Sequence, residues 1–144
     1  MKKSITILIY LIITVLITVG CNSNVQEFNI DEIALKEAKK ITSEQGYTLK
    51  SETLTESNLL IGDSDVFKFI KDASIDGGYS EEDFNSITED RKVVGYELEE
   101  KSKFEDMPVM LYLVIDEGKV IGAFLDYSGY TPSIAPINFK GYLK

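Results

Sequence analysis

The sequence predicts an α+β domain in which helices of the N-terminal half pack on a small antiparallel sheet of three to four strands. Two observations predict it. Between residues 29 and 84 apolar side chains recur at helical spacing, and from Lys92 onward they alternate with a period of two. A run of strands that follows a run of helices is typical of α+β domains. The sheet is expected to end in a β-hairpin.

The first expected helix lies in NIDEIALKEAKKITSEQG, residues 29–46. Asn29 can cap its N-terminus, and Glu32 three residues later completes a capping box. The isoleucines and alanines recur every three or four positions, so they form one apolar stripe. Gly46 is a favoured residue for ending a helix.

Two shorter helices are expected next, after a weakly alternating stretch at 47–55 that predicts a strand. The segment GDSDVFKFIKDAS, 62–74, has helical apolar spacing, although a short strand through VFKFI is the alternative. The segment SEEDFNSITED, 80–90, starts with the capping residue Ser80 and carries acidic side chains in its first turn, which predicts a third helix.

The sheet is expected in residues 92–102, 107–116 and 119–127, where Glu117-Gly118 predicts a tight hairpin. The two hairpin strands are apolar on both faces, so both faces must be covered. Helices are expected on one face, and the C-terminal segment, a partner or a second copy on the other. The last stretch, 128–144, contains two prolines and is expected to be irregular.

The N-terminus has the composition of an export signal. Two lysines follow Met1, residues 4–20 carry no charge, and Cys21 is the only cysteine in the chain. A basic start, an apolar run and a small residue at its end are typical of a secretory signal peptide. The run is also about the minimum length of a spanning helix, so a retained membrane anchor is the alternative.

The tetrapeptide Thr18-Val19-Gly20-Cys21 resembles the lipobox of bacterial lipoproteins, and the order of elements resembles that of small lipoproteins of Gram-positive bacteria. The resemblance implies that residues 1–20 are a signal peptide cleaved after Gly20. It also implies that Cys21 is lipidated and holds the protein on the cell membrane, facing outside the cytoplasm. Residues 21–28 would be the lipidated tether and 29–144 a single α+β domain. Acyl chains supply about 0.8 kcal/mol of membrane affinity per buried methylene group.

The segment VIDEGKVI, 114–121, is loosely similar to the closing hairpin of PepSY-type domains. These are small extracytoplasmic modules in which a helix precedes a sheet. The resemblance implies the same fold class, and it supplies no site residue.

Composition limits the chemistry. Removal of the first 20 of 144 residues takes two of the 15 basic side chains and none of the 24 acidic ones, which changes the net charge from −9 to −11. Such a charge repels nucleic acid and anionic headgroups, so no nucleic-acid partner is expected. The chain has no histidine, which excludes Ser-His and Cys-His pairs. We therefore expect no enzyme, but a binding or regulatory role at the cell envelope, with an envelope protein or a second copy as partner.

The segment DASIDGGYSEED, 72–83, is a candidate EF-hand loop for Ca²⁺, and no other cofactor is expected. The ligands would be Asp72, Ser74, Asp76, the carbonyl of Gly78, and Asp83. Asp83 is shorter than the glutamate that normally closes such a loop, and no second loop exists. The alternative is a turn at residues 76–78 followed by a helix cap at Ser80.

Aromatic residues gather near the C-terminus. Tyr127, Tyr130 and Tyr142 are candidates for partner contact, because a tyrosine offers rigid area and a polar tip. The alternative is that they fold back over the sheet.

Overall fold

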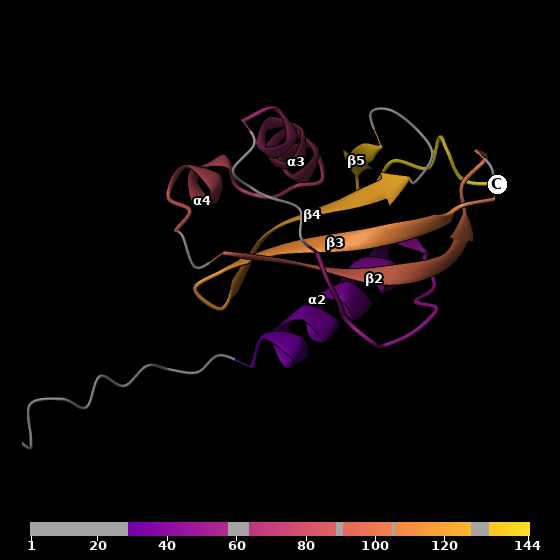
Figure 1. Ribbon diagram of the computed structural model, residues 1–144, viewed down its shortest axis with the longest axis horizontal. Helices are drawn as coiled ribbons and strands as arrows, with labels where there is room; N and C mark the ends of the chain where they lie inside the picture. Colours follow the sequence, from indigo (N-terminus) through magenta and orange to yellow (C-terminus); the bar gives the residue numbers. More distant parts are fainter. Residues whose placement is uncertain (1–28, 58–63, 89–90, 105, 128–132) are drawn as a thin grey trace, which may run out of the picture.

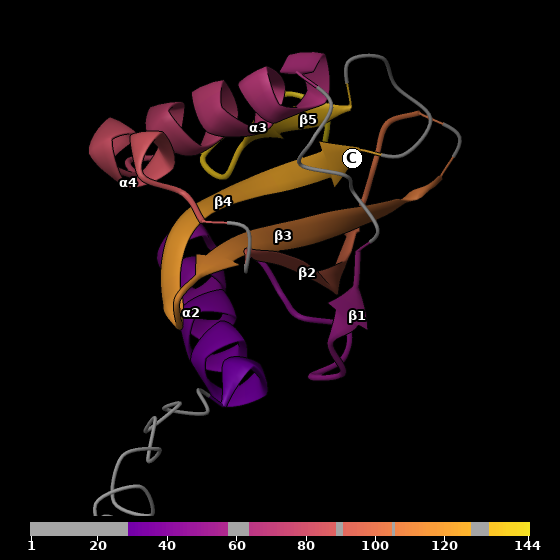
Figure 2. The same ribbon diagram turned by 60° about the vertical axis from the view of Figure 1, so that its left-hand side comes forward.

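The computed structural model describes residues 29–57, 64–88, 91–104, 106–127 and 133–144. The described elements are, in chain order, α2 (Ile30–Gln45), β1 (Thr55–Glu56), α3 (Ser64–Asp76), α4 (Glu81–Asn85), β2 (Lys92–Lys101), β3 (Pro108–Asp116), β4 (Lys119–Tyr127) and β5 (Ile134–Pro136). The strands form one antiparallel sheet in the order β1-β2-β3-β4-β5. The fold is therefore α+β, with α2 on one face of the sheet and α3 on the other (Figures 1 and 2).

The expected count of three to four strands was wrong, because the described sheet has five. The additional strands are β1 and β5, which are two and three residues long and lie at the two edges. In the stretch expected to form a strand, 47–55, Leu49 makes only an isolated bridge to Leu98, and β1 begins at its last residue. The hairpin does not end the sheet either, since β5 pairs with β4.

Helix α2 forms as predicted. Asn29 caps it by accepting a hydrogen bond from the Glu32 N–H at 3.3 Å. It ends at Gly46, whose φ of 73° lies in the left-handed region that glycine adopts without strain. The buried side of the helix consists of Ala34, Ala38, Ile41 and Thr42. Small residues at its centre allow the helix axis to approach the sheet closely.

Helices α3 and α4 confirm the second and third predicted helices, and the alternative strand through VFKFI was wrong. Ile70 and Ala73 of α3 are buried, and Phe84 of α4 is buried beside them. Ser80 caps α4 by accepting a hydrogen bond from the Glu82 N–H at 3.2 Å. Residues 72–74, which the sequence placed both in the second helix and in the candidate loop 72–83, belong to α3.

The β3–β4 hairpin confirms the predicted turn. Glu117 and Gly118 have φ values of 47° and 75°. Positive φ at both central residues is the mark of the two-residue turns whose twist matches that of the strands. Asp116 and Lys119 are the last register partners before the turn.

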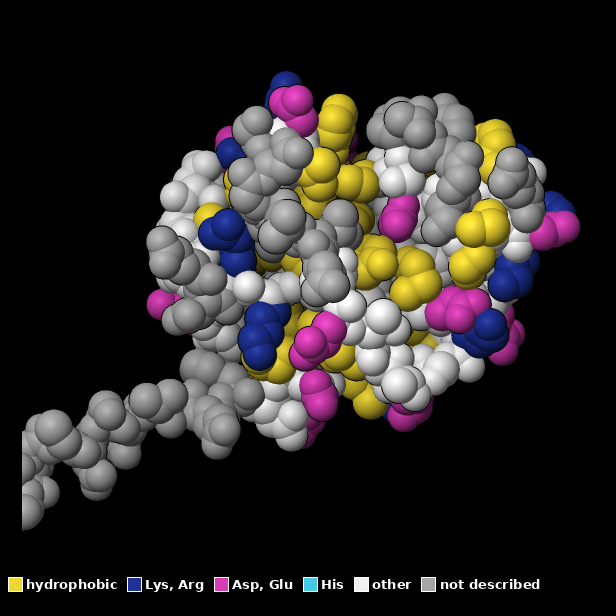
Figure 3. Space-filling view, in the orientation of Figure 1, with side chains coloured by type: hydrophobic (Ala, Val, Ile, Leu, Met, Phe, Trp, Pro, Cys, Tyr) yellow, Lys and Arg dark blue, Asp and Glu magenta, His cyan; other side chains and the backbone are white. Residues whose placement is uncertain are grey.

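Helices cover both faces of the sheet, which corrects the expectation that they cover only one. The larger apolar cluster joins α2 to the sheet, and the smaller joins α3 and α4 to the other face. Helix α3 lies over β4 and β5, and hydrophobic side chains are visible beside it in the space-filling view (Figure 3). Both clusters consist of residues from Ile30 onward, so a chain that begins at Asn22 keeps all of them.

Candidate functional site

The predicted processing residues Gly20 and Cys21 lie outside the described residues, as does Tyr130. None of the helices in the described ranges has the length and apolar character that a membrane span requires.

The structure has a helix where the EF-hand interpretation needs a loop. Asp72, Ser74 and Asp76 all belong to α3. Successive residues of an α-helix are rotated by about 100°, so positions two apart point to opposite sides. Accordingly Ser74 is fully buried, whereas Asp72 and Asp76 are exposed. Their side chains cannot converge on one ion, and the predicted loop geometry is wrong.

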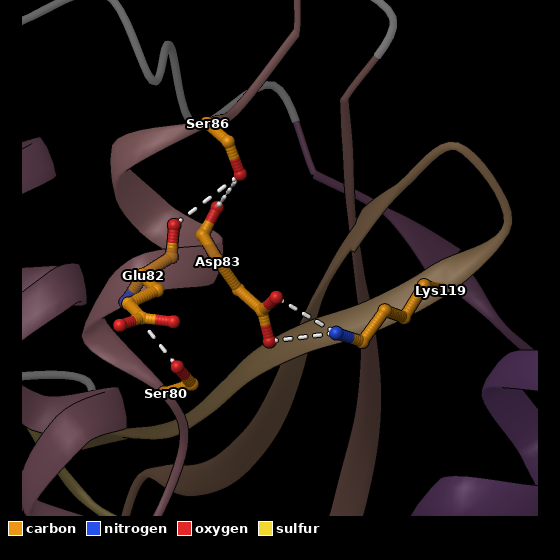
Figure 4. A network of polar contacts seen from close by, with 5 residues as sticks. All are labelled: Ser80, Glu82, Asp83, Ser86 and Lys119. Atoms are coloured by element: carbon orange, nitrogen blue, oxygen red, sulfur yellow. Dashed lines mark hydrogen bonds and ion pairs between the residues drawn. The ribbon is translucent and has the colours of Figure 1, made fainter.

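The remaining residues of the candidate loop form the end of α3 and the start of α4. Gly78, with φ of 102°, makes the turn. Both carboxylate oxygens of Asp83 accept hydrogen bonds from Nζ of Lys119, at 2.7 and 2.8 Å, as Figure 4 shows. Asp83 therefore ties α4 to the β3–β4 hairpin. In the described part of the chain, no group of three or more Asp, Glu, His or Cys side chains is placed to hold a metal ion.

Tyr127 belongs to the core, and Tyr142 packs against it partly buried. Tyr127 is fully buried, and its hydroxyl donates a hydrogen bond to the Phe139 carbonyl at 2.7 Å. Tyr142 packs edge-on against Tyr127 and Phe139, with ring centroids 5.5 and 4.8 Å apart. The prediction that Tyr127 contacts a partner was therefore wrong, because the C-terminal segment folds back over the sheet and buries it.

A groove lies between the N-terminal half of α2 and the β1 edge. Its volume is about 770 Å³, within the range of about 300–1,000 Å³ that is usual for ligand sites. The two elements that border it lie at the same end of the molecule in Figure 2. The residues that line it, here called the acidic groove, are Asn29, Asp31, Glu32, Leu35, Glu52, Thr53, Leu54, Glu56 and Tyr96.

Four carboxylates line the acidic groove, and no lysine or arginine does. Only Glu52 has an ion-pair partner among the described residues, the Lys39 ammonium group at 2.6 Å. The carboxylates of Asp31, Glu32 and Glu56 have none within the described ranges. The groove therefore carries a strong local excess of negative charge.

Tyr96 lines the acidic groove from β2, at its sheet side. The residue is 99 % buried, with 1 % of its surface exposed, and no hydrogen bond of its hydroxyl occurs among the described residues. Burial raises the pKa of this hydroxyl, and the negative charges of Asp31 and Glu52 raise it further. The hydroxyl oxygen is not among the buried side-chain atoms that lack a partner in the described structure, so the ring is buried while the oxygen stays accessible at the wall of the groove. A ligand in the groove can therefore exchange a hydrogen bond with it.

Sequence reasoning missed the acidic groove. Its acidic residues come from two separate segments, and Tyr96 comes from a third, the strand expected at 92–102. The local signal was present: Asp31 and Glu32 in the first turn of a helix, and Glu52 and Glu56 four residues apart. Nothing in the sequence indicated that the two segments meet.

No family model, curated protein or solved structure matches the chain.

Proposed function

We propose that this protein is a lipid-anchored extracytoplasmic binding protein of the cell envelope, without enzymatic activity, and that the acidic groove binds an organic cation. One observation carries the second part of this proposal. Three carboxylates without ion-pair partners among the described residues line the same groove as Tyr96, whose ring is buried and whose hydroxyl has no partner in the described part of the chain.

The chemistry of the acidic groove suits a primary ammonium or guanidinium group on an apolar stem. Such groups carry only hydrogen-bond donors, and carboxylates carry only acceptors. A pair of opposite unit charges at 4 Å gains about 1 kcal/mol in water and about 4 kcal/mol at an effective dielectric constant of 20. Leu35 and Leu54 offer contact to the methylene groups of the stem. Tyr96 can accept one further hydrogen bond from the cation.

The N-terminal sequence supports the anchored location. Eight residues, 21–28, separate the start of the predicted mature chain from Asn29, which lines the acidic groove. A fully extended segment of eight residues spans at most roughly 29 Å. A ligand of the groove would therefore be captured close to the outer surface of the membrane.

Anchoring is tested by expressing the full chain in a bacterium that is fed an alkyne analogue of palmitate. The account predicts that the mature protein incorporates the label and fractionates with membranes. Cys21→Ala should abolish the label. A labelled Cys21→Ala chain, or an unlabelled parent chain, would count against lipidation.

Cation binding is tested by calorimetric titration of residues 22–144 with spermidine at low salt. We expect Asp31→Asn/Glu56→Gln to weaken binding by about tenfold or more, which corresponds to about 1.4 kcal/mol. The matched control Asp72→Asn/Glu99→Gln removes the same charge from exposed positions outside the groove. Equal weakening in both double variants would mean that spermidine responds to net charge only and would overturn the proposed site.

A further inference from the structure

We propose that the natural ligand of the acidic groove is an extended basic segment of an envelope protein, which adds as a strand to the β1 edge of the sheet. This inference rests on the proposed function, and it names the kind of ligand that the groove takes.

The β1 edge offers backbone hydrogen-bonding groups. In the described sheet β1 is the first strand, so it has a neighbour on one side only, β2. The Ser57 N–H donates to the Val93 carbonyl at 3.0 Å, which makes these two residues a hydrogen-bonded pair of the antiparallel ladder. Such pairs alternate with non-bonded ones. Glu56, opposite Val94 in the register, is a non-bonded position, so its N–H and carbonyl point away from β2.

The same residues border the groove and the edge. Leu54 and Glu56 line the acidic groove, and the backbone of Glu56 faces the side of β1 on which no described strand lies. A strand added there places alternate side chains on each face of the sheet. Every second side chain of the added strand would point toward α2, where the carboxylate of Asp31 and the hydroxyl of Tyr96 lie. Backbone pairing and side-chain capture would thus act together, as in other cases of strand addition.

The negative charge of the acidic groove indicates which kind of chain binds at the β1 edge. The tether residues 21–28 contain Glu27 and neither lysine nor arginine, so they do not complement the groove. A second copy joined edge to edge by a twofold axis would bring two acidic grooves together, because such an interface repeats the same surface on both subunits. Like charges at close range oppose that contact. A partner segment with lysine or arginine at alternate positions matches both the charge and the edge.

The test uses residues 22–144 and three peptides of equal charge. The first alternates lysine with threonine over seven residues, the second is N-methylated at every lysine, and the third at every threonine. N-methylation removes a backbone donor and leaves the charge unchanged. In an added strand only one alternate set of N–H groups faces β1. We expect one methylated peptide to lose about tenfold or more in affinity and the other to bind like the parent.

A protein variant checks the same edge. Glu56→Pro removes the outward N–H and keeps the pairing of β1 with β2, because position 56 gives no hydrogen bond to β2. Its matched control, Glu56→Gln, removes only the charge. We expect Glu56→Pro to bind the parent peptide at least threefold more weakly than Glu56→Gln at an unchanged melting temperature.

The outcomes separate the two proposals. Equal binding of all three peptides would overturn strand addition and leave the groove as a site for free cations. If spermidine binds and none of the peptides does, strand addition is likewise overturned and the groove remains a site for free cations. If neither spermidine nor any peptide binds, the proposed function itself fails. A dimer of residues 22–144 that dissociates in Glu56→Pro would overturn the inference by making a second copy the occupant.

Discussion

The ring of Tyr112 occupies the space in which a side chain at position 95 would stand. A Cβ atom added to Gly95 would lie 2.5 Å from Cε1 of Tyr112, its register partner on the adjacent strand. The same ring stacks on Phe124 of β4, with centroids 5.4 Å apart and an interplanar angle of 24°. Tyr112 thus bridges β2 and β4 across the face that α3 covers only in part.

Gly95→Ala should destabilise the fold, because the tyrosine ring must move out of its stacked position. Overpacking of this kind costs about 1–3 kcal/mol. Urea unfolding of residues 22–144 measures it. In the double variant Gly95→Ala/Tyr112→Ala the clash is absent, so the cost of the glycine change should largely vanish. If the losses of unfolding free energy in the two single variants simply add up in the double variant, the two residues are not in conflict and this interpretation of the contact is contradicted.

Tyr127→Phe should lower the free energy of unfolding by about 1 kcal/mol, because the Phe139 carbonyl loses its buried donor. The measurement is again urea unfolding. An unchanged stability in Tyr127→Phe, together with lost partner capture, would restore the earlier interpretation of this tyrosine as a contact residue.

Stability should fall as the pH rises above 10. Burial raises the pKa of the Tyr47 hydroxyl to about 12, and Glu100 adds to the effect. An unfolded tyrosine ionises near pH 10, so between about pH 10 and 12 the unfolded chain binds fewer protons than the folded one. The stability that Tyr47 contributes is fully present below pH 10 and is lost between pH 10 and 12. Over this window the free energy of unfolding should fall by about 1 kcal/mol per pH unit. Melting curves of Tyr47→Phe should show a shallower decline above pH 10.

Calcium should give no specific increase of the melting temperature. A ligand of the folded state raises the midpoint by mass action, but Asp72 and Asp76 are separated from Ser74 by the helix, and Asp83 is paired with Lys119. Thermal melts in chelator, in a few millimolar calcium and in magnesium compare the three conditions. A rise that only calcium produces, and that Asp76→Ala removes, would contradict the structural interpretation of residues 72–83.

Local signals explain which elements could be predicted. The cap at Asn29, the stop at Gly46 and the turn at Glu117-Gly118 act through contacts within a few residues, so each is readable from the sequence. β1 and β5 have no such signal. A strand of two or three residues has too few positions to show alternation, and its existence depends on pairing with a distant strand.

The alternative for residues 72–83, a turn followed by a helix cap at Ser80, is confirmed. The sequence left the calcium loop open because these residues satisfy two patterns at once. The segment DASID suits the alternate ligands of a loop, and it also continues the apolar spacing of Ile70 and Ala73. The segment forms a helix because its apolar side, with Ile70 and Ala73, is buried against β4. The acidic groove could not be predicted at all, because Asp31, Glu56 and Tyr96 meet only through the packing of α2 across the sheet.

Nuclear magnetic resonance can locate the ligand of this protein residue by residue, and so decide whether the acidic groove binds it. Isotopically labelled residues 22–144 are titrated with the peptide of alternating lysine and threonine. The account predicts saturable shift changes centred on Tyr96, Leu54 and Glu56, with little change at Tyr142. Shifts that spread evenly over the acidic surface, or that centre on the C-terminal segment, would contradict it.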